Sequence, residues 1–226
     1  MSGIASRPKV LLFDVNETLL DLTPVKETVN RVLLDEHGAA VWFSNLLHHS
    51  LVMTVNGRYS DFAEIGAAVL QMLARNRDVV LSDGDARRTL AVMRSLPAHD
   101  DVRPALERLK RAGYRLAALT NSSQAGAQAQ LGHAGLADCF ERQLSVQATG
   151  KFKPDPAVYV WAAAEMRAGA SECMLVAAHG WDIAGAKWAG MQAAFIAREG
   201  QQKFPLAPPP DIDVSDLAAL ANALAA

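Results

Sequence analysis

The sequence predicts a doubly wound α/β fold, in which a parallel sheet carries helices on both faces and a helical cap is inserted after the first strand. The first observation is a short apolar run, Val10–Phe13, that ends at an acid, Asp14. Uninterrupted runs of this length are typical of central parallel strands that are buried on both faces. The second is an all-helical stretch over residues 20–98. The third is the alternation of strand and helix patterns after Pro97, which is typical of parallel strands joined by right-handed crossovers.

The inserted stretch carries four helical patterns. Their expected positions, in chain order, are residues 23–33, 40–55, 62–73 and 83–96. Thr23 is the expected N-cap of the first helix, and Pro24 lies in its first turn. Ser82 caps the fourth helix in the same way. We therefore divide the chain into a helical cap domain, residues 20–98, and an α/β core domain formed by residues 1–19 and 99–226.

The remainder of the core is expected to alternate between strands and helices. In chain order, the expected strands are residues 115–119, 144–146 (a short edge segment), 174–178 and 193–196, and the expected helices are residues 102–113, 124–131, 156–167, 183–189 and 214–224. Residues 205–210 are rich in proline and are expected to form a stiff loop. Trp161, Trp188 and Met191 fall on apolar stripes, so we expect them in the core.

Composition excludes several classes of function. The 226 residues are 50% hydrophobic, which is enough for one sizeable core and a smaller second unit. The formal net charge of −2 gives no basic excess for binding nucleic acid or an anionic membrane. Met1–Lys9 lacks the apolar core of a signal peptide, and Cys139 and Cys173 have no metal or redox spacing and are typical of separate thiols in a reducing compartment. We expect a cytoplasmic protein that acts on a small molecule, without a nucleic-acid or membrane partner.

Polar clusters follow three of the expected strands. They are Asp14 to Thr18, Thr120-Asn121-Ser122, and His179 to Asp182, and Lys153 lies in a fourth polar segment. The carboxyl ends of parallel strands meet at one edge of a sheet, where open α/β folds bind their ligands. We therefore expect these side chains to converge, with Asp14 as a candidate nucleophile or metal ligand. The structural alternative is that Asp14 caps the turn that follows it.

Four motifs in this order carry a resemblance to a known family. They are Phe13-Asp-Val-Asn-Glu-Thr-Leu-Leu20, Leu119-Thr-Asn121, Lys153-Pro-Asp155 and His179-Gly-Trp-Asp182. Together with the helical insertion after the first, they resemble the haloacid dehalogenase superfamily over nearly the whole chain. The segments Lys153 to Tyr159, Ala178 to Asp182 and Gly57 to Phe62 are most similar to the type II 2-haloacid dehalogenases.

The resemblance implies a chemistry and a role for each site residue. Asp14 would be the catalytic nucleophile and form a covalent ester that water hydrolyses, while Lys153 keeps it ionised. Asp182 would position Lys153 or the hydrolytic water. The implied substrate-binding residues are Asn16, Thr18, Phe43, Thr120, Asn121, Tyr159 and His179. No metal or other cofactor is implied, and a homodimer is plausible.

Several of these residues also have a purely structural interpretation. Lys153 alone would be a solvated loop lysine, and Thr18 a capping residue of the turn. Asp182 could be the N-cap of the helix that starts at Ile183. His179, which replaces an Asn of the family pattern, could orient water or titrate near neutral pH, or it could be a hydrogen-bonded histidine at a strand end.

Asn16 separates two reactions of the superfamily. Most of its phosphatases have an Asp at this position, which protonates the leaving alcohol and contributes roughly 10²–10⁴-fold. An amide has no titrating proton to give, whereas a halide is a weak base and leaves without one. Asn16 therefore favours hydrolysis of a carbon–halogen bond, although the type II dehalogenases have an aromatic residue there.

Phe43 is the second departure from the family pattern. It stands where the type II dehalogenases have an Arg that grips the substrate carboxylate, and a bidentate Arg–carboxylate pair is stronger than an ordinary hydrogen bond. The leading hypothesis is a 2-haloacid dehalogenase that acts through an ester on Asp14. The alternatives are an Mg²⁺-dependent phosphatase, with Asp14, the Asn16 carbonyl and Asp182 as ligands, and a non-catalytic binding protein with this fold.

Overall fold

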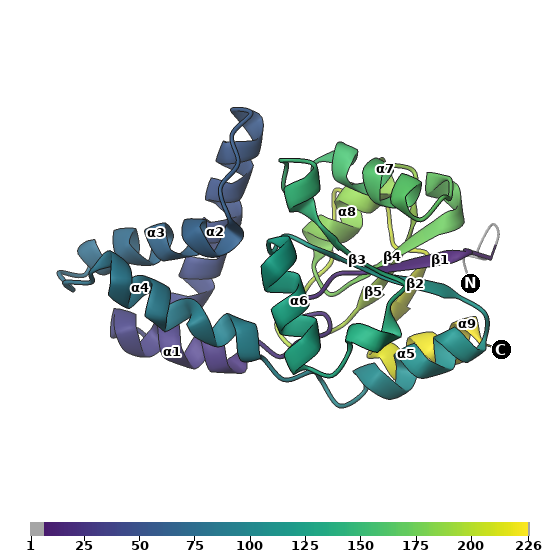
Figure 1. The fold of residues 1–226 in the computed structure, drawn as a ribbon, viewed down its shortest axis with the longest axis horizontal. Coiled ribbons are helices and arrows are strands. Elements are labelled where there is room, and N and C mark those ends of the chain that lie inside the picture. Colours follow the sequence, from purple (N-terminus) through teal and green to yellow (C-terminus); the bar gives the residue numbers. More distant parts are fainter. Residues whose placement is uncertain (1–6, 226) are drawn as a thin grey trace.

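A parallel sheet of six strands organises the computed structural model, which describes residues 7–225 (Figure 1). Most of Met1–Lys9, considered above for a signal peptide, lies outside the described residues. The strands are β1 (Val10–Phe13), β2 (Arg115–Thr120), β3 (Arg142–Ser145), β4 (Cys173–Ala177), β5 (Gln192–Ile196) and β6 (Ile212–Val214). Their order across the sheet is β3-β2-β1-β4-β5-β6. The chain runs outward from β1 through β2 and β3, returns to β4 on the other side of β1, and runs outward again through β5 and β6.

The register of the strands brings the polar strand ends to one level. Phe13, the last residue of β1, pairs with Ala118 of β2 on one side and with Val176 of β4 on the other. Every residue of β1 and β4 is buried, as expected for strands covered on both faces. Asp14, Thr120 and His179 therefore emerge at the same carboxyl edge of the sheet.

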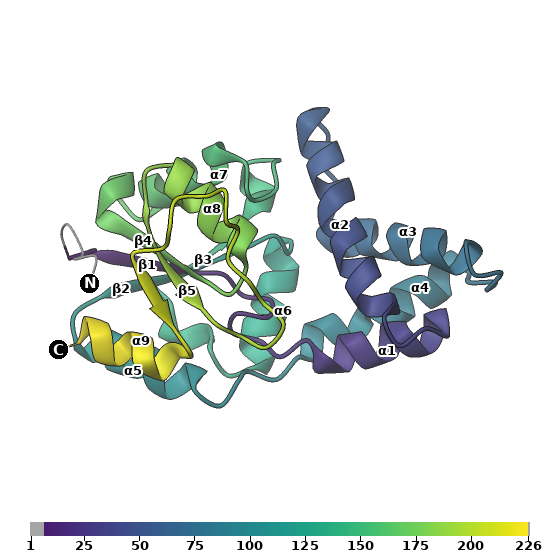
Figure 2. The same ribbon diagram turned by 180° about the vertical axis from the view of Figure 1, so that it is seen from behind.

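Helices cover both faces of the sheet. They are α5 (Val102–Arg111), α6 (Gln124–His133), α7 (Pro156–Glu165), α8 (Gly180–Trp188) and α9 (Leu217–Leu224). Both views place α7 and α8 on one face and α5 and α9 on the other (Figures 1 and 2). The predicted doubly wound α/β architecture is confirmed.

A second group of helices stands beyond the carboxyl edge of the sheet (Figures 1 and 2). It contains α1 (Thr23–Leu33), α2 (Gly38–Val55), α3 (Phe62–Arg75), α4 (Asp83–Leu90) and a 3-10 helix (Ala91–Ser95). The two chain segments that lead into and out of this cap run side by side. Leu20 and Ala98 form an antiparallel bridge, and the Asp21 N–H donates to the Pro97 carbonyl at 2.9 Å.

Three local expectations were wrong. The N-cap of α1 is Leu22, and the Thr23 hydroxyl instead donates to Asp21 Oδ1 at 2.7 Å. Helix α8 begins at Gly180, so Asp182 lies inside its first turn and is not an N-cap. Trp188 is 59% exposed at the end of this helix. An apolar stripe indicates a buried face only where another element covers it, and Trp188 meets only the edge of Phe204 among the aromatic rings described.

Two further differences concern the ends of predicted helices. The fourth cap helix ends at Leu90 and continues as the 3-10 helix. The segment expected as one helix from Val214 begins with the short edge strand β6 and becomes helical only at Leu217, after Asp216 caps the Ala219 N–H. Within residues 7–225, no helix is both long and apolar enough to cross a membrane.

Candidate active site

Asp14 lies at the centre of a buried network of charges. Its backbone N–H donates to the Val176 carbonyl at 3.0 Å, which holds it against the end of β4. Oδ1 accepts a hydrogen bond from Lys153 Nζ at 2.9 Å. Oδ2 accepts bonds from the Thr18 hydroxyl at 2.7 Å and from His179 Nδ1 at 3.1 Å. The two carboxylate oxygens therefore face two different groups of residues.

On the Oδ1 side lies the inner cluster, which we define as Lys153, Asp182 and Tyr159. Lys153 Nζ donates to Asp182 Oδ2 at 2.5 Å and to the Leu119 carbonyl at 3.1 Å, as well as to Asp14. Its three N–H donors are thus all used. The Tyr159 hydroxyl donates to the other oxygen of Asp182 at 2.5 Å. All three side chains are buried without measurable exposure.

Gly185 makes the contact between Tyr159 and Asp182 possible. A Cβ atom at residue 185 would lie 2.5 Å from the Tyr159 hydroxyl oxygen and 2.5 Å from the Cβ of Pro154. Real Cβ atoms do not approach that closely, so only glycine lets helix α8 sit against Tyr159. The Lys153 side chain beside them has no exposed area.

The charges of Asp14 and Lys153 stabilise each other against burial. Burial disfavours the ionised form of Asp14, but Lys153 and His179 outweigh it and hold the pKa of Asp14 well below its usual range. Burial would lower the pKa of Lys153, but Asp14 and Asp182 raise it. Asp14 is therefore an anion and Lys153 a cation throughout the neutral range.

Thr18 is oriented by the strand next to β1. The Ala178 N–H donates to the Thr18 hydroxyl oxygen at 2.9 Å, and this hydroxyl donates in turn to Asp14 Oδ2. Because the oxygen already accepts one hydrogen, its own hydrogen is directed at the carboxylate. Thr18 is thus a fixed donor to Asp14.

On the Oδ2 side lies the outer row, which we define as His179, Glu17 and Lys26. His179 Nε2 lies 3.0 Å from Glu17 Oε2, and Lys26 Nζ donates to Glu17 Oε1 at 2.6 Å. Gln201 Nε2 adds a bond of 2.7 Å to Glu17 Oε2. Glu17 has a positive φ of 66°, which turns its side chain away from Asp14 and toward the imidazole.

The outer row keeps His179 charged. Burial would lower the pKa of His179, but the hydrogen bonds and charges of Asp14 and Glu17 raise it to about 9. His179 therefore carries a proton on both ring nitrogens at neutral pH, and does not titrate there while Asp14 is ionised. The hydrogen bond and charge of His179, together with those of Lys26, lower the pKa of Glu17 against the effect of its burial.

The amide of Asn16 has a fixed orientation. Gln130 Nε2 on α6 donates to Asn16 Oδ1 and to the Met93 carbonyl of the cap, both at 2.9 Å. A carbonyl can only accept, so Met93 fixes which end of the Gln130 amide faces it, and Gln130 then fixes Asn16. Asn16 Nδ2 lies 3.4 Å from the Ser122 hydroxyl.

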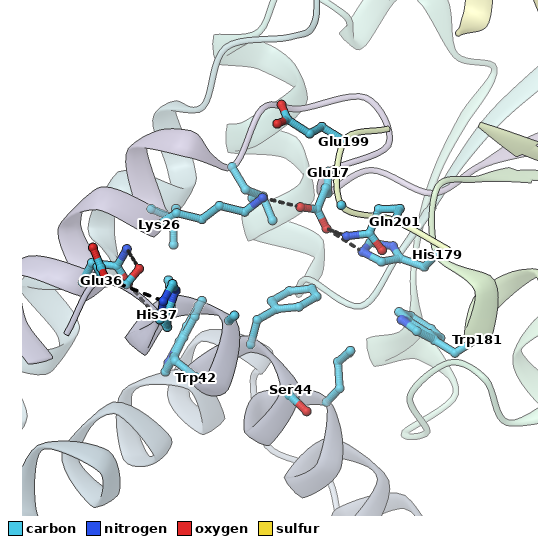
Figure 3. Close-up of a pocket in the computed structure, with 18 residues that line it drawn as sticks. Glu17, Lys26, Glu36, His37, Trp42, Ser44, His179, Trp181, Glu199 and Gln201 are labelled. Atoms are coloured by element: carbon cyan, nitrogen blue, oxygen red, sulfur yellow. Dashed lines mark hydrogen bonds and ion pairs between the residues drawn. The ribbon is translucent and has the colours of Figure 1, made fainter. Parts of the chain in front are cut away.

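A cavity of about 480 Å³ opens between the cap and the core, beside the outer row (Figure 3). Helices α1 and α2 form one wall, and His179, Trp181 and residues 199–201 form the other. The lining contains one Lys, Lys26, and no Arg. Glu36 and Glu199 also line it, so the cavity holds no excess of positive charge.

The geometry can be compared with known proteins. A family model described as haloacid dehalogenase-like hydrolase matches residues 8–190. The chain belongs to the haloacid dehalogenase-like hydrolase family. The family resemblance seen in the four sequence motifs is therefore confirmed, and the family places this chain among hydrolases.

Individual members of the haloacid dehalogenase-like family are similar over almost the whole chain. The (S)-2-haloacid dehalogenase of Pseudomonas sp. (strain YL) is 30% identical, over 94% of this chain and 92% of its own. The (S)-2-haloacid dehalogenase 4A of Burkholderia cepacia is 29% identical, over 96% and 91%. A crystal structure of a dehalogenase with an intermediate complex has a TM-score of 0.88 and 26% identity, over 98% and 99%.

Most of the residues expected at the site lie in contact with one another. Asp14, Thr18, Lys153, Asp182 and His179 form one hydrogen-bonded network. Asn121 Oδ1 accepts the Lys153 backbone N–H at 3.0 Å, and Thr120 Oγ1 accepts the Ser122 N–H at 3.1 Å. These two acceptors hold the backbone of the segments that carry the network.

Of the expected substrate-binding residues Tyr159 and Phe43, only Phe43 lines the cavity. Tyr159 does not line the cavity, because it is fully buried behind Asp182. Phe43 does line it and stacks on the His179 ring, where the type II dehalogenase pattern has an Arg. Among the described residues, no group of three or more His, Cys, Asp or Glu side chains could hold a metal ion.

Sequence reasoning missed Glu17, Lys26, Gln130 and Trp181 as members of the site. Glu17 lies between two expected site residues, Asn16 and Thr18, but the motif gives it no role. Its role depends on a positive φ that no local pattern predicts. Gln130 gave a weak signal, as a polar residue at a position of α6 that faces the core.

Proposed function

We propose that this protein hydrolyses the carbon–halogen bond of small 2-haloacids through an ester on Asp14. One observation carries the proposal: Asp14 is a buried carboxylate that is kept ionised, and within residues 7–225 its Oδ1 accepts only the Lys153 bond. Oδ1 therefore keeps a lone pair for attack. The relatives named (S)-2-haloacid dehalogenase, and the dehalogenase solved with an intermediate, support the same chemistry.

In the first half of the reaction, Asp14 Oδ1 attacks the carbon that carries the halogen. The new C–O bond forms as the C–halogen bond breaks, and the halide leaves with the bonding electron pair. Asp14 becomes a neutral ester, whose carbonyl oxygen is Oδ2. Halide needs no proton to leave, which fits an Asn at residue 16 whose Oδ1 is occupied by Gln130.

Formation of the ester changes the state of His179. The negative charge of Asp14 is one of the causes that raise the pKa of His179 to about 9, and the ester removes that charge. The pKa of His179 then falls, and its Nδ1 proton passes to solvent. Glu17 still accepts from Nε2, so the imidazole becomes a neutral base with its lone pair on Nδ1, beside the ester.

In the second half, His179 accepts a proton from a water that attacks Asp14 Cγ. The tetrahedral intermediate carries its negative charge on Oδ2, where the Thr18 hydroxyl donates. The intermediate expels the alkoxide, which takes the proton from His179, and the Asp14 acid that remains returns a proton to His179. The sum is one haloacid and one water converted to one hydroxy acid, one halide and one proton.

Two alternatives are less well supported. For an Mg²⁺-dependent phosphatase, Asn16 offers no proton to a leaving alcohol, and the Lys153 ammonium already bridges Asp14 and Asp182. For a non-catalytic binding protein, nothing would require a nucleophile held ionised by a buried lysine, and such perturbed pairs are typical of catalytic sites. We therefore assign catalytic roles to Asp14, Lys153, Asp182 and His179, with no cofactor.

We also propose the division into a cap, residues 20–98, and a core, residues 1–19 and 99–226, since the paired linker segments meet at the Leu20–Ala98 bridge.

A cytoplasmic location is supported by the two cysteines, which are both buried free thiols. A homodimer is supported by exposed apolar side chains on one part of the cap. These are Leu51, Val52 and Val55 of α2 and Met72 of α3.

Release of halide tests the proposed function. Purified protein would be incubated with L- and D-2-chloropropionate and with chloroacetate, in the presence of EDTA, beside an Asp14→Asn variant. We expect halide from the wild type alone, with no requirement for added metal. No halide from any of the three substrates, combined with phosphate release from a Mg²⁺-supplemented panel of phosphomonoesters, would favour the phosphatase instead.

A further inference from the structure

The imidazole of His179 lies beside two aromatic rings that belong to different parts of the molecule. Phe43 of the cap helix α2 stacks on one face, with ring centroids 5.7 Å apart and planes inclined by 25°. Trp181 of the core helix α8 stacks nearby, at 5.2 Å and 29°. Stacked rings at these distances attract each other, and an aromatic face also favours a cation.

Among the described residues, the hydrogen bonds of the His179 side chain lie at its two nitrogen atoms. Nδ1 faces Asp14 and Nε2 faces Glu17, both of which belong to the core. Of the four neighbours that hold the ring, Phe43 alone comes from the cap. We propose that Phe43 is a positioning residue that holds the His179 base for hydrolysis of the Asp14 ester, so that the base is complete only while the cap is closed on the core. This inference rests on the proposed function.

The need for Phe43 arises at the second half-reaction. In the free protein the ring is held at both nitrogens, and the ion pair with Asp14 fixes its tilt. Once Asp14 is an ester, the bond to Glu17 remains at Nε2, and one hydrogen bond allows the ring to rock about it. Stacking against Phe43 and Trp181 then keeps Nδ1 directed at the water, and a displacement of about 1 Å can cost roughly 10²-fold in rate.

Phe43 is itself held firmly by the cap. Its ring contacts Trp42 at a centroid distance of 6.3 Å. Trp42 is buried, and its indole N–H donates to the Gly66 carbonyl of α3 at 2.9 Å. Movement of the cap as a body therefore carries Phe43 with it. The Phe43 ring takes the place of the Arg that, in the type II dehalogenase pattern, binds the substrate carboxylate. In this chain, a contact to the His179 base therefore replaces a contact to the substrate.

The test separates the two half-reactions in three variants. Phe43→Leu removes the ring but keeps an apolar side chain, Phe43→Tyr restores a ring, and Val41→Ala changes an exposed residue of the same helix. Rapid mixing with excess 2-chloropropionate would measure the halide burst, and intact-protein mass spectrometry would measure the Asp14 ester. In Phe43→Leu we expect a burst within about threefold of the wild type, ester hydrolysis roughly tenfold or more slower, and accumulation of the ester.

Phe43→Tyr is expected to hydrolyse the ester within about threefold of the wild type, and Val41→Ala to behave as the wild type. Equal slowing of burst and hydrolysis in Phe43→Leu, or a higher KM with unchanged hydrolysis, would overturn the proposal and make Phe43 a substrate contact. Failure of Phe43→Tyr to restore hydrolysis would overturn it too, since a ring alone would then not suffice.

A measurement without substrate distinguishes this inference from the proposed function. The carbon-bound protons of His179 lie beside two rings, whose ring currents shift their NMR signals. Phe43→Leu should move these signals and change the midpoint of the His179 titration, while Phe43→Tyr should leave both near the wild-type values. If the wild type releases no halide but these shifts occur, the proposed reaction fails and the contact of the cap with His179 stands. If Phe43→Leu leaves the signals unmoved, the inference fails whatever the reaction is.

Discussion

The two sides of the Asp14 carboxylate are built differently. On the Oδ1 side, the inner cluster of Lys153, Asp182 and Tyr159 is sealed from solvent and every donor of the ammonium group has a partner. On the Oδ2 side, the outer row of His179, Glu17 and Lys26 runs toward the cavity, and the Lys26 side chain is 50% exposed. The inner cluster places a buried cation against Oδ1 of the nucleophile, whereas all three residues of the outer row line the cavity.

The two sides also differ in their relation to the family pattern. Each residue of the inner cluster belongs to the pattern of the type II dehalogenases. In the outer row, His179 departs from that pattern, Glu17 lies inside the first motif without a role in it, and Lys26 belongs to no motif. The need for an ionised nucleophile restricts which residues can form the inner cluster. The residues of the outer row can differ, because water can be activated in more than one way. Four experiments test this contrast.

Lys153→Met should have the largest effect. It removes the cation between two buried carboxylates, and breaking a buried pair typically costs roughly 3–5 kcal/mol. The pKa of Asp14 would rise, a neutral acid cannot attack, and no halide should be released. Urea unfolding and halide release measure the two effects. Lys151→Met is the matched control, because its ammonium pairs with Asp155 near the surface, and such a pair contributes roughly 0–1 kcal/mol.

The second experiment compares stability at different pH values. The pKa of His179 rises from 6.5 to about 9 on folding, so its contribution is fully present below pH 6.5 and is lost as the pH rises through 9. A shift of this size corresponds to about 3 kcal/mol. The free energy of unfolding should therefore fall more steeply between pH 7 and 10 in the wild type than in His179→Gln. Equal slopes in the two proteins would show that the outer row does not hold the proton.

Glu17→Gln is the third test, and it addresses the outer row during catalysis. Gln cannot stabilise the imidazolium that forms when His179 takes a proton from water, so hydrolysis of the ester should slow by roughly 10²-fold. The halide burst should change little, because Lys153 still holds Asp14 ionised. Glu199→Gln, which removes a carboxylate from the same cavity wall, should leave both half-reactions within about threefold. A slower burst in Glu17→Gln would show that the outer row also acts in formation of the ester, and not in its hydrolysis alone.

The strand-end residues and the inner cluster could be predicted from the sequence, while Glu17 and Lys26 of the outer row could not. Asp14, Thr120 and His179 lie at the ends of apolar strands, and the parallel sheet alone requires their convergence. Lys153, Asp182 and Tyr159 could be added from their motifs. Glu17, which has a positive φ, meets Lys26 from the first turn of α1. The hydrophobic periodicity of the sequence does not predict this contact.

The N-caps of the helices show the same limit of prediction from the sequence. Ser82 and Asp155 cap their helices as their sequences indicate, through bonds to the Asp85 and Ala157 N–H groups. Thr23 has an equally good pattern, yet its hydroxyl is taken by Asp21, two residues before it. Local propensity is a weak prior wherever a neighbouring side chain offers the same atoms a better partner.

Gln130→Met is the smallest test, and it concerns the link between the cap and Asn16. The Gln130 amide serves Asn16 and the Met93 carbonyl, so its loss leaves two buried acceptors without a donor, although the buried Gln130 Oε1 is itself without a partner. These effects partly offset each other, and we expect a net destabilisation of about 1 kcal/mol. Gln128→Met, on the exposed side of the same helix, should be neutral within about 0.5 kcal/mol.

The effect of Gln130→Met on the reaction is more informative than its effect on stability. Without Gln130, the Asn16 amide is free to turn, and its position relative to Ser122 is no longer set by the cap. If Asn16 supports departure of the halide, the burst should slow several-fold more for a chloro substrate than for a bromo substrate, because chloride leaves less readily. Ester hydrolysis should be unchanged, since it depends on the outer row. Equal slowing of both substrates would instead make Gln130 a contact that only holds the cap on the core.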